Sequence, residues 1–240
     1  MTLHGLGSGA FAWLAIAVLS CGGDKAVPDL VSATSAPGVL TPVARSTVVP
    51  VTVTPALGGG ALLDALRGGG YIIVFRHALT DQAQGDDLSA ILLDIREGGD
   101  RTPKDDCALQ RNLTAAGREQ SRMIGREIER LGIPHTRALT SPYCRTKETA
   151  GFAFGLYEIN IDLTLIVGAD TGDLIQTATR KLLSAKPPPG LNTIMITHVS
   201  NTLLVGLPTI AEGDSLVLQP NGSNWTVIAH VKAADWLDFR

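Results

Sequence analysis

Four side chains suited to phosphate chemistry are spread along this chain of 240 residues. They are two imidazoles and two guanidiniums: His77, His198, Arg76 and Arg145. A guanidinium forks onto phosphate oxygens and, in a partly dry cleft, stabilises the charge that develops during phosphoryl transfer. A neutral histidine in line with phosphorus can attack it and form a phosphohistidine, which water then hydrolyses. These residue types predict phosphoryl transfer to histidine, which requires no metal.

Separate strands must bring these residues together. From residue 71 onward, short β-rich runs alternate with helical stretches, which predicts an α/β domain with a mainly parallel sheet. The expected strands are residues 71–75, 136–141 and 192–197, followed by a closing hairpin of residues 214–220 and 225–231. In such sheets ligands bind beyond the carboxyl ends of the strands, where helix N-termini favour anions. Because the first three strands all end on polar residues, the sequence predicts an anion site at that edge.

Helices are expected between and before these strands. They cover residues 61–67, 115–132, 142–155, 171–185 and 198–206. Thr114 can cap the long second helix and Gly132 can end it, and Pro142 is expected in the first turn of the third helix. Residues 156–170 carry no readable pattern and predict irregular structure.

Four motifs in this order resemble the histidine phosphatase superfamily, the phosphoglycerate-mutase-like phosphatases. "FRHALTD" is similar to the family's Arg-His-Gly motif, with Ala78 in place of the glycine, and "LTAAGREQS" is similar to its helix start. "TSPYCRTKET" matches the segment Ser-x3-Arg-x3-Thr through Ser141, Arg145 and Thr149, and "ITHVSN" matches the second histidine. The likeness covers about residues 71–220. It implies a three-layer α/β/α sandwich with a mainly parallel central sheet.

The resemblance implies a role for each residue of the site. His77 is the phosphoryl acceptor, Arg76, Arg145 and His198 form the phosphate pocket, and Thr80 is a further phosphate donor. No cofactor is implied. A metal site fits poorly, because the two histidines stand 121 positions apart with none of the spacings typical of His-based metal sites.

The acid that protonates the leaving alcohol has no matching residue. Glu212 is the first candidate, because in the relatives the loop before the closing strand runs beside the pocket. Asp81, just beyond the nucleophile, is the second candidate, and Asp170 and Asp173 stay open.

Other polar residues have simpler interpretations. Arg111 and Asn112 precede the long helix, where they could reach the cleft or act as cap and surface residues. His135 is expected at the surface and His230 in a structural position in the last hairpin.

The N-terminal part predicts export. Residues 1–21 lack charged side chains, and residues 10–19 among them form an apolar run. Such a run is typical of a signal-peptide core and is short for a membrane span. The ending "VLSC" resembles a bacterial lipobox, which implies lipidation of Cys21 and a periplasmic or cell-surface location. An uncleaved anchor or a misassigned start is the alternative.

Residues 22–60, rich in proline and glycine, predict a flexible linker before a folded domain at residues 61–240.

Two cysteines remain once Cys21 is assigned to a lipid. In an oxidising compartment, Cys107 and Cys144 most simply form a disulfide. Two free buried thiols are the alternative.

Composition and motifs together narrow the function. A net charge of −3 and the lack of any Lys/Arg run give no footprint for nucleic acid. The expected activity is metal-independent, acid-phosphatase-type hydrolysis of a phosphomonoester, either a phosphorylated small molecule or a phosphopeptide. A phosphomutase is disfavoured, because few residues lie between the motifs to cover the cleft against water. A non-catalytic lipoprotein that binds phosphate or a partner is the other alternative.

Overall fold

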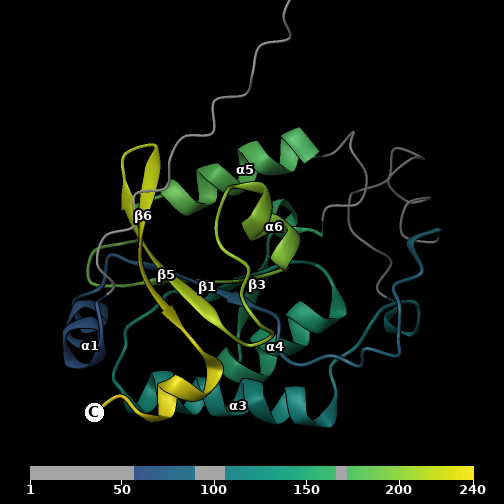
Figure 1. Cartoon of the computed structure of the whole chain (residues 1–240), viewed down its shortest axis with the longest axis horizontal. Helices are drawn as coiled ribbons and strands as arrows, with labels where there is room; N and C mark the ends of the chain where they lie inside the picture. Colours follow the sequence, from purple (N-terminus) through teal and green to yellow (C-terminus); the bar gives the residue numbers. More distant parts are fainter. Residues whose placement is uncertain (1–56, 90–105, 166–171) are drawn as a thin grey trace, which may run out of the picture. The chain divides into compact units, whose positions relative to one another are not determined.

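The computed structural model describes residues 57–89, 106–165 and 172–240 (Figure 1). The predicted leader with Cys21, most of the predicted linker, and Asp170 lie outside the described residues. Within the described ranges, no helix has the length and apolar character needed to cross a membrane.

In the described part of the chain, six strands form one sheet in the order β3-β2-β4-β1-β5-β6 (Figure 1). Their bounds are β1 Ile72–Arg76, β2 Ala138–Thr140, β3 Tyr157–Ile159, β4 Thr193–Thr197, β5 Ser215–Asn221 and β6 Asn224–Val231. The first four strands pair in parallel, whereas β5 is antiparallel to both β1 and β6. Five of these six strands therefore point the same way, and the predicted α/β class with a mainly parallel sheet is confirmed.

Helices cover both faces of the sheet. The α-helices are α1 Gly59–Gly68, α3 Ala115–Arg130, α4 Cys144–Phe154, α5 Gly172–Ser184 and α6 Val199–Leu204. Short 3-10 helices are η1 Cys107–Leu109, η2 Ile161–Leu163 and η4 Ala233–Leu237. In β1, Ile73 and Phe75 pack with α1, α3, α4 and η4, while Ile72 and Val74 pack with α5, η2 and the chain after α6. Because both of its faces are buried, β1 is apolar almost throughout. The predicted three layers are confirmed.

Local sequence signals set the ends of α3. The Thr114 hydroxyl accepts a hydrogen bond from the amide of Gly117 at 2.9 Å, as predicted for an N-cap. After the helix, Gly132 adopts a φ of 64°, a left-handed conformation that glycine reaches at little cost.

Two predictions about secondary structure are wrong. Residues 156–170, expected to be irregular, include β3, whose three residues are all exposed at the sheet edge and so carry no buried pattern. Pro142 does not lie in the first turn of α4. Tyr143 after it is still extended, with a ψ of 144°, and the helix begins at Cys144.

Candidate active site

Three neighbouring strands, β2, β4 and β1, bring the predicted residues together. Arg76 ends β1 and lies opposite Thr197, which ends β4, so the residues that follow, His77 and His198, leave the sheet side by side. The centroids of their rings are 5.6 Å apart. Arg145 lies in the first turn of α4, which follows β2. The convergence expected at the carboxyl ends of the strands is present.

The backbone sets the proton position of His77, which is 2% exposed. Its Nδ1 lies 3.0 Å from the carbonyl oxygen of Ala78. Because a carbonyl oxygen can only accept, Nδ1 carries the proton and Nε2 keeps its lone pair. Burial lowers the pKa of His77 to about 3, and the charge of Arg145 adds to this effect. The ring is therefore neutral near pH 7, the form that can attack phosphorus.

His198 is a second buried, neutral imidazole. Burial, followed by the charge of Arg145, lowers its pKa well below the ordinary value. Its Nε2 lies 2.8 Å from the Ser141 hydroxyl oxygen, which accepts from the amide of Tyr143 at 3.4 Å. The hydroxyl can thus donate to Nε2, which leaves the proton of the ring on Nδ1. That atom is buried and has no hydrogen-bond partner among the described residues.

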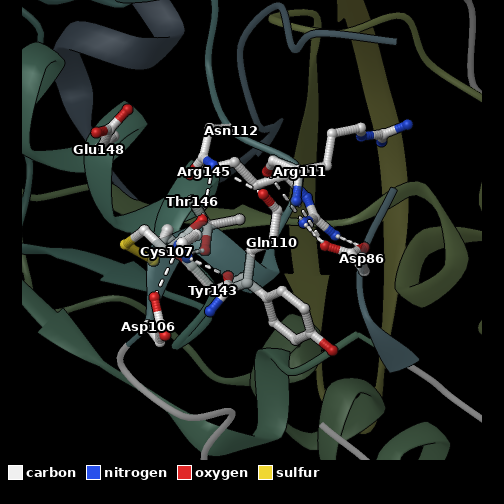
Figure 2. The surroundings of a disulfide bond; sticks show 12 residues. Asp86, Asp106, Cys107, Gln110, Arg111, Asn112, Tyr143, Arg145, Thr146 and Glu148 are labelled. Atoms are coloured by element: carbon white, nitrogen blue, oxygen red, sulfur yellow. Dashed lines mark hydrogen bonds and ion pairs between the residues drawn. A yellow bond between two sulfur atoms is a disulfide. The ribbon is translucent and has the colours of Figure 1, made fainter. Parts of the chain in front are cut away.

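The carboxylate of Asp86 binds the terminal amino groups of the Arg145 guanidinium (Figure 2). The two terminal amino groups of Arg145 donate to the two carboxylate oxygens at 2.8 and 3.2 Å. Arg145 is 2% exposed, and its guanidinium carbon lies 4.7 Å from the centroid of the Tyr143 ring. Burial lowers the pKa of Arg145, and the nearby Asp86 charge opposes that shift. An arginine nonetheless stays cationic at physiological pH, so the ion pair is a fixed part of the site.

Glu212 gathers donors from two loops. Arg76 donates to it at 3.3 Å, and a terminal nitrogen of Arg111 lies 3.7 Å away. Thr80 donates both its amide, at 3.0 Å, and its hydroxyl, at 2.7 Å, and the Gln82 amide group donates at 3.1 Å. Burial raises the pKa of Glu212, but the hydrogen bonds from Thr80 and the charge of Arg76 outweigh burial and lower it. The Thr80 hydroxyl, predicted as a phosphate donor, is thus engaged with Glu212.

Three guanidiniums share one feature. The Nε–H groups of Arg76, Arg111 and Arg145 are buried and, within the described residues, lack a hydrogen-bond partner. Their terminal amino groups, in contrast, all have acceptors or carboxylates nearby. Leaving a buried donor unpaired costs about 1–3 kcal/mol. Nδ1 of His198 is a further donor of this kind. The three guanidiniums and this imidazole together suit an acceptor with several oxygens, such as a tetrahedral oxyanion.

The remaining candidates make contacts of other kinds. The Asp81 carboxylate accepts from the amide of Ala83 in a turn, and Asp173 is exposed at the start of α5. His135 packs edge-on against an aromatic ring, and Nε2 of His230 lies 3.0 Å from a carboxylate oxygen of Asp214. The described part of the chain contains no group of three His, Cys, Asp or Glu side chains placed to hold a metal ion.

Two residues that position the site were not singled out from the sequence. Asp86 lies in an acid-rich stretch without a motif. Gln120 accepts from the amide of Leu79 at 3.0 Å and donates to the carbonyl of Glu212 at 3.2 Å, so it ties both loops to α3. For Gln120, the available signal in the sequence was its position three residues after Gly117, which places both residues on one face of the helix.

The structure joins Cys107 and Cys144 by a disulfide, with their Cα atoms 5.7 Å apart (Figure 2). Cys107 opens η1, and Cys144 is the first residue of α4, directly before Arg145. The bridge therefore attaches the segment before α3 to the helix that carries an arginine of the site.

Comparisons with known proteins give structural likeness only. No family model and no curated protein sequence matches the chain. The protein histidine phosphatase SixA complexed with tungstate is 16% identical with a TM-score of 0.45, covering 69% of this chain and 98% of SixA. TTHB049 from Thermus thermophilus is 17% identical with a TM-score of 0.42, covering 68% of this chain and 99% of its own. A phosphoserine phosphatase mutant from Entamoeba histolytica, in complex with phosphoserine, is 10% identical with a TM-score of 0.44. The match covers 68% of this chain and 97% of the phosphatase. At these values the likeness adds nothing to the fold class that the strand order shows.

Proposed function

We propose that this protein is a phosphomonoesterase that works through a phosphohistidine on His77 without a metal ion. One set of observations carries the proposal. Within the described residues, the buried Nε–H groups of Arg76 and Arg145 and Nδ1 of His198 have no hydrogen-bond partner, and the ring of His198 lies 5.6 Å from the neutral ring of His77, whose Nε2 keeps its lone pair. Such donors match the oxygens of a phosphoryl group, and the lone pair matches its phosphorus.

The reaction proceeds in two steps. First, Nε2 of His77 forms a bond to phosphorus while the bond between phosphorus and the ester oxygen breaks, and the leaving alcohol takes a proton. The guanidinium and imidazole donors stabilise the charge on the phosphoryl oxygens during this transfer. Water then attacks the phosphohistidine and gives a proton to the group that protonated the alcohol, which releases inorganic phosphate and restores both the neutral ring and the acid.

Glu212 is the proposed proton donor. Without substrate its pKa is lowered, mainly because hydrogen bonds from Thr80 and the charge of Arg76 outweigh burial. A bound phosphate dianion competes for the same arginine and places negative charge beside the carboxylate, and both effects raise a carboxyl pKa. Substrate binding therefore favours the protonated form of Glu212 that the first step needs.

The proposed setting is outside the cytoplasm. The apolar run over residues 10–19 and the "VLSC" ending support export and lipid anchoring through Cys21, and a disulfide suits an oxidising compartment. The proposed substrates are phosphorylated small molecules or phosphopeptides. The mass of the mature protein tests the anchor, since cleavage before Cys21 and addition of acyl chains change it in a defined way.

The function is tested by hydrolysis of an aryl phosphate in the presence of a chelator. His77→Ala is expected to lower turnover by at least about 10³-fold, because the nucleophile is lost. His135→Gln, which changes a histidine outside the site, is the control and is expected to keep full activity. Protein quenched in alkaline detergent should carry labelled phosphate only when His77 is present, because the bond between phosphorus and nitrogen survives base but not acid. Turnover that survives in His77→Ala rejects the mechanism, and phosphate binding without any hydrolysis in the wild type supports the non-catalytic alternative.

A further inference from the structure

Arg111 lies in a segment that the disulfide attaches to α4. This segment, residues 107–113, is called the arginine segment below. Its Gln110 side chain accepts a hydrogen bond from the amide of Cys144 at 2.8 Å, and its Arg111 carbonyl accepts one from Arg145 at 3.5 Å (Figure 2). The segment therefore contacts the start of α4 through one covalent bond and two hydrogen bonds.

The other side of the arginine segment contacts Asp86. One carboxylate oxygen of Asp86 accepts from the amide of Arg111 at 3.0 Å and from the guanidinium of Arg145 at 2.8 Å. The amide of Asp87 also donates to the carbonyl of Leu109 at 2.8 Å. A single carboxylate thus fixes the backbone of one arginine and the side chain of another.

The side chain of Arg111 extends from this anchored backbone into the site. Its terminal nitrogens lie 3.3 Å from the Gln82 carbonyl oxygen and 3.7 Å from Glu212, and its buried Nε–H has no hydrogen-bond partner among the described residues. The side chain is 24% exposed, whereas Arg145 is nearly closed off. Arg111 is therefore a cation of the site that solvent can reach.

We propose that Arg111 is a third guanidinium that binds the substrate phosphate, and that the Cys107–Cys144 disulfide holds it in place, so that reduction of the disulfide weakens phosphate binding. The inference rests on the proposed function only in its assumption that the site binds phosphate. Its physical basis is that the disulfide is the covalent tie between the arginine segment and the helix of Arg145.

The disulfide is open to reduction from one side. Cys107 is exposed and Cys144 is buried. A dithiol such as dithiothreitol attacks the exposed sulfur, and Cys144 leaves as a thiolate at the first turn of α4, where the helix dipole favours negative charge. The second thiol of the reagent then closes its ring. Two electrons and two protons pass from the reagent to the protein, which gains two thiols.

Binding of inorganic phosphate to the full chain, measured by calorimetry, tests the role of Arg111. Arg111→Ala is expected to weaken binding about 10- to 100-fold, the loss typical of a charged hydrogen bond. Arg126→Ala is the matched control, because Arg126 is an exposed arginine of α3 that pairs with Glu119. Its affinity is expected to stay within about twofold. Wild-type affinity in Arg111→Ala overturns the inference.

The role of the disulfide is tested by reducing the wild type and Arg111→Ala in parallel. Thiol titration counts the two released thiols, and circular dichroism checks that the reduced protein stays folded. Reduction is expected to weaken phosphate binding of the wild type about 10-fold and to change that of Arg111→Ala less than about twofold, because coupled changes are not additive. An equal effect on both proteins, no effect on the wild type, tighter binding, or global unfolding on reduction overturns this part.

These measurements separate the inference from the proposed function, since phosphate binding needs no turnover. A protein that binds phosphate through Arg111 but hydrolyses no ester contradicts the function alone. A phosphatase whose phosphate affinity and KM are unchanged in Arg111→Ala contradicts the inference alone.

Discussion

A short hydrogen-bonded chain connects the proposed nucleophile to Arg145. The Ala78 carbonyl accepts from His77, the Ala78 amide donates to the Thr149 hydroxyl at 3.0 Å, and that hydroxyl donates to the carbonyl of Arg145 at 2.7 Å. Thr149 is buried, so none of these groups can turn to water instead. The threonine of the Ser-x3-Arg-x3-Thr segment therefore has a physical task, which is to hold the loop of the histidine against the helix of the arginine.

Replacing Thr149 by valine is expected to lower stability and activity together. Valine keeps the shape but leaves the buried Ala78 amide unpaired, at a cost of about 1–3 kcal/mol in the free energy of unfolding. The loop can then rotate His77, so kcat should fall more than KM rises. Urea unfolding and steady-state kinetics measure the two effects. Unchanged kinetics in a destabilised Thr149→Val protein would show that Thr149 contributes to stability and does not position His77.

A second prediction concerns the role of Glu212 in proton transfer. Alkyl phosphates have poor leaving groups that need a proton, whereas aryl phosphates need little protonation. Glu212→Gln is therefore expected to slow an alkyl phosphate at least about 10² times more than an aryl phosphate. Equal losses on both substrates would show that Glu212 acts by holding Arg76 and Thr80, and would direct attention to Asp81.

At the scale of elements, α3 supports both loops of the site through its first two turns. Thr114 and Gln120 contact the backbone of Leu79, and Gln120 also contacts the backbone of Glu212. The approach is so close that a Cβ atom on Gly117 would overlap the Leu79 carbonyl oxygen. Further along the helix, a Cβ atom on Gly125 would overlap the carbonyl oxygen of Ala153 in α4.

These two glycines allow a matched comparison. Gly117→Ala and Gly125→Ala should each lower the free energy of unfolding by about 1–3 kcal/mol, because backbone must shift in both. Only Gly117→Ala is expected to lower kcat/KM strongly, since its clash displaces the loop that follows His77. Denaturant unfolding and kinetics on both proteins provide the check. Equal kinetic losses would mean that α3 transmits strain along its whole length.

The elements also show which features the sequence could predict. The buried strand β1, the capped helix α3 and the hairpin of β5 and β6 each carry a local pattern, and all three were predicted. Strand β3 was missed because its three residues are exposed and too few for a period. Asp86 was not recognised as a partner of the site, and for Arg111 a place in the cleft and a surface role were both left open, because the contacts of both residues depend on how two loops meet across the end of the sheet.

At the scale of the whole molecule, the buried histidines make stability depend on pH. The pKa of His77 is lowered by burial to about 3, and that of His198 lies well below its ordinary value. In the unfolded chain a histidine titrates near pH 6.5. Below that pH the unfolded chain therefore binds protons that the folded protein does not, and stability falls as the pH falls.

The expected slope approaches about 1.4 kcal/mol per pH unit for each buried histidine as the pH drops from 6.5 toward 5. Urea unfolding at several pH values measures it. In a variant with His77→Asn and His198→Asn, the pH dependence over this range should largely disappear. A variant that keeps the wild-type slope would place its origin in other groups.

The strand order β3-β2-β4-β1 affects how the chain is made as well as how it works. Strand β4 lies between β2 and β1, yet it leaves the ribosome after both, and Ile72 pairs with Thr193. A nascent chain that ends before β4 already contains His77 and Arg145, but it lacks His198 and the strand that pairs with both β1 and β2. On the proposed function, prematurely terminated translation products are therefore inert toward phosphate esters, and activity appears only once β4 has been inserted.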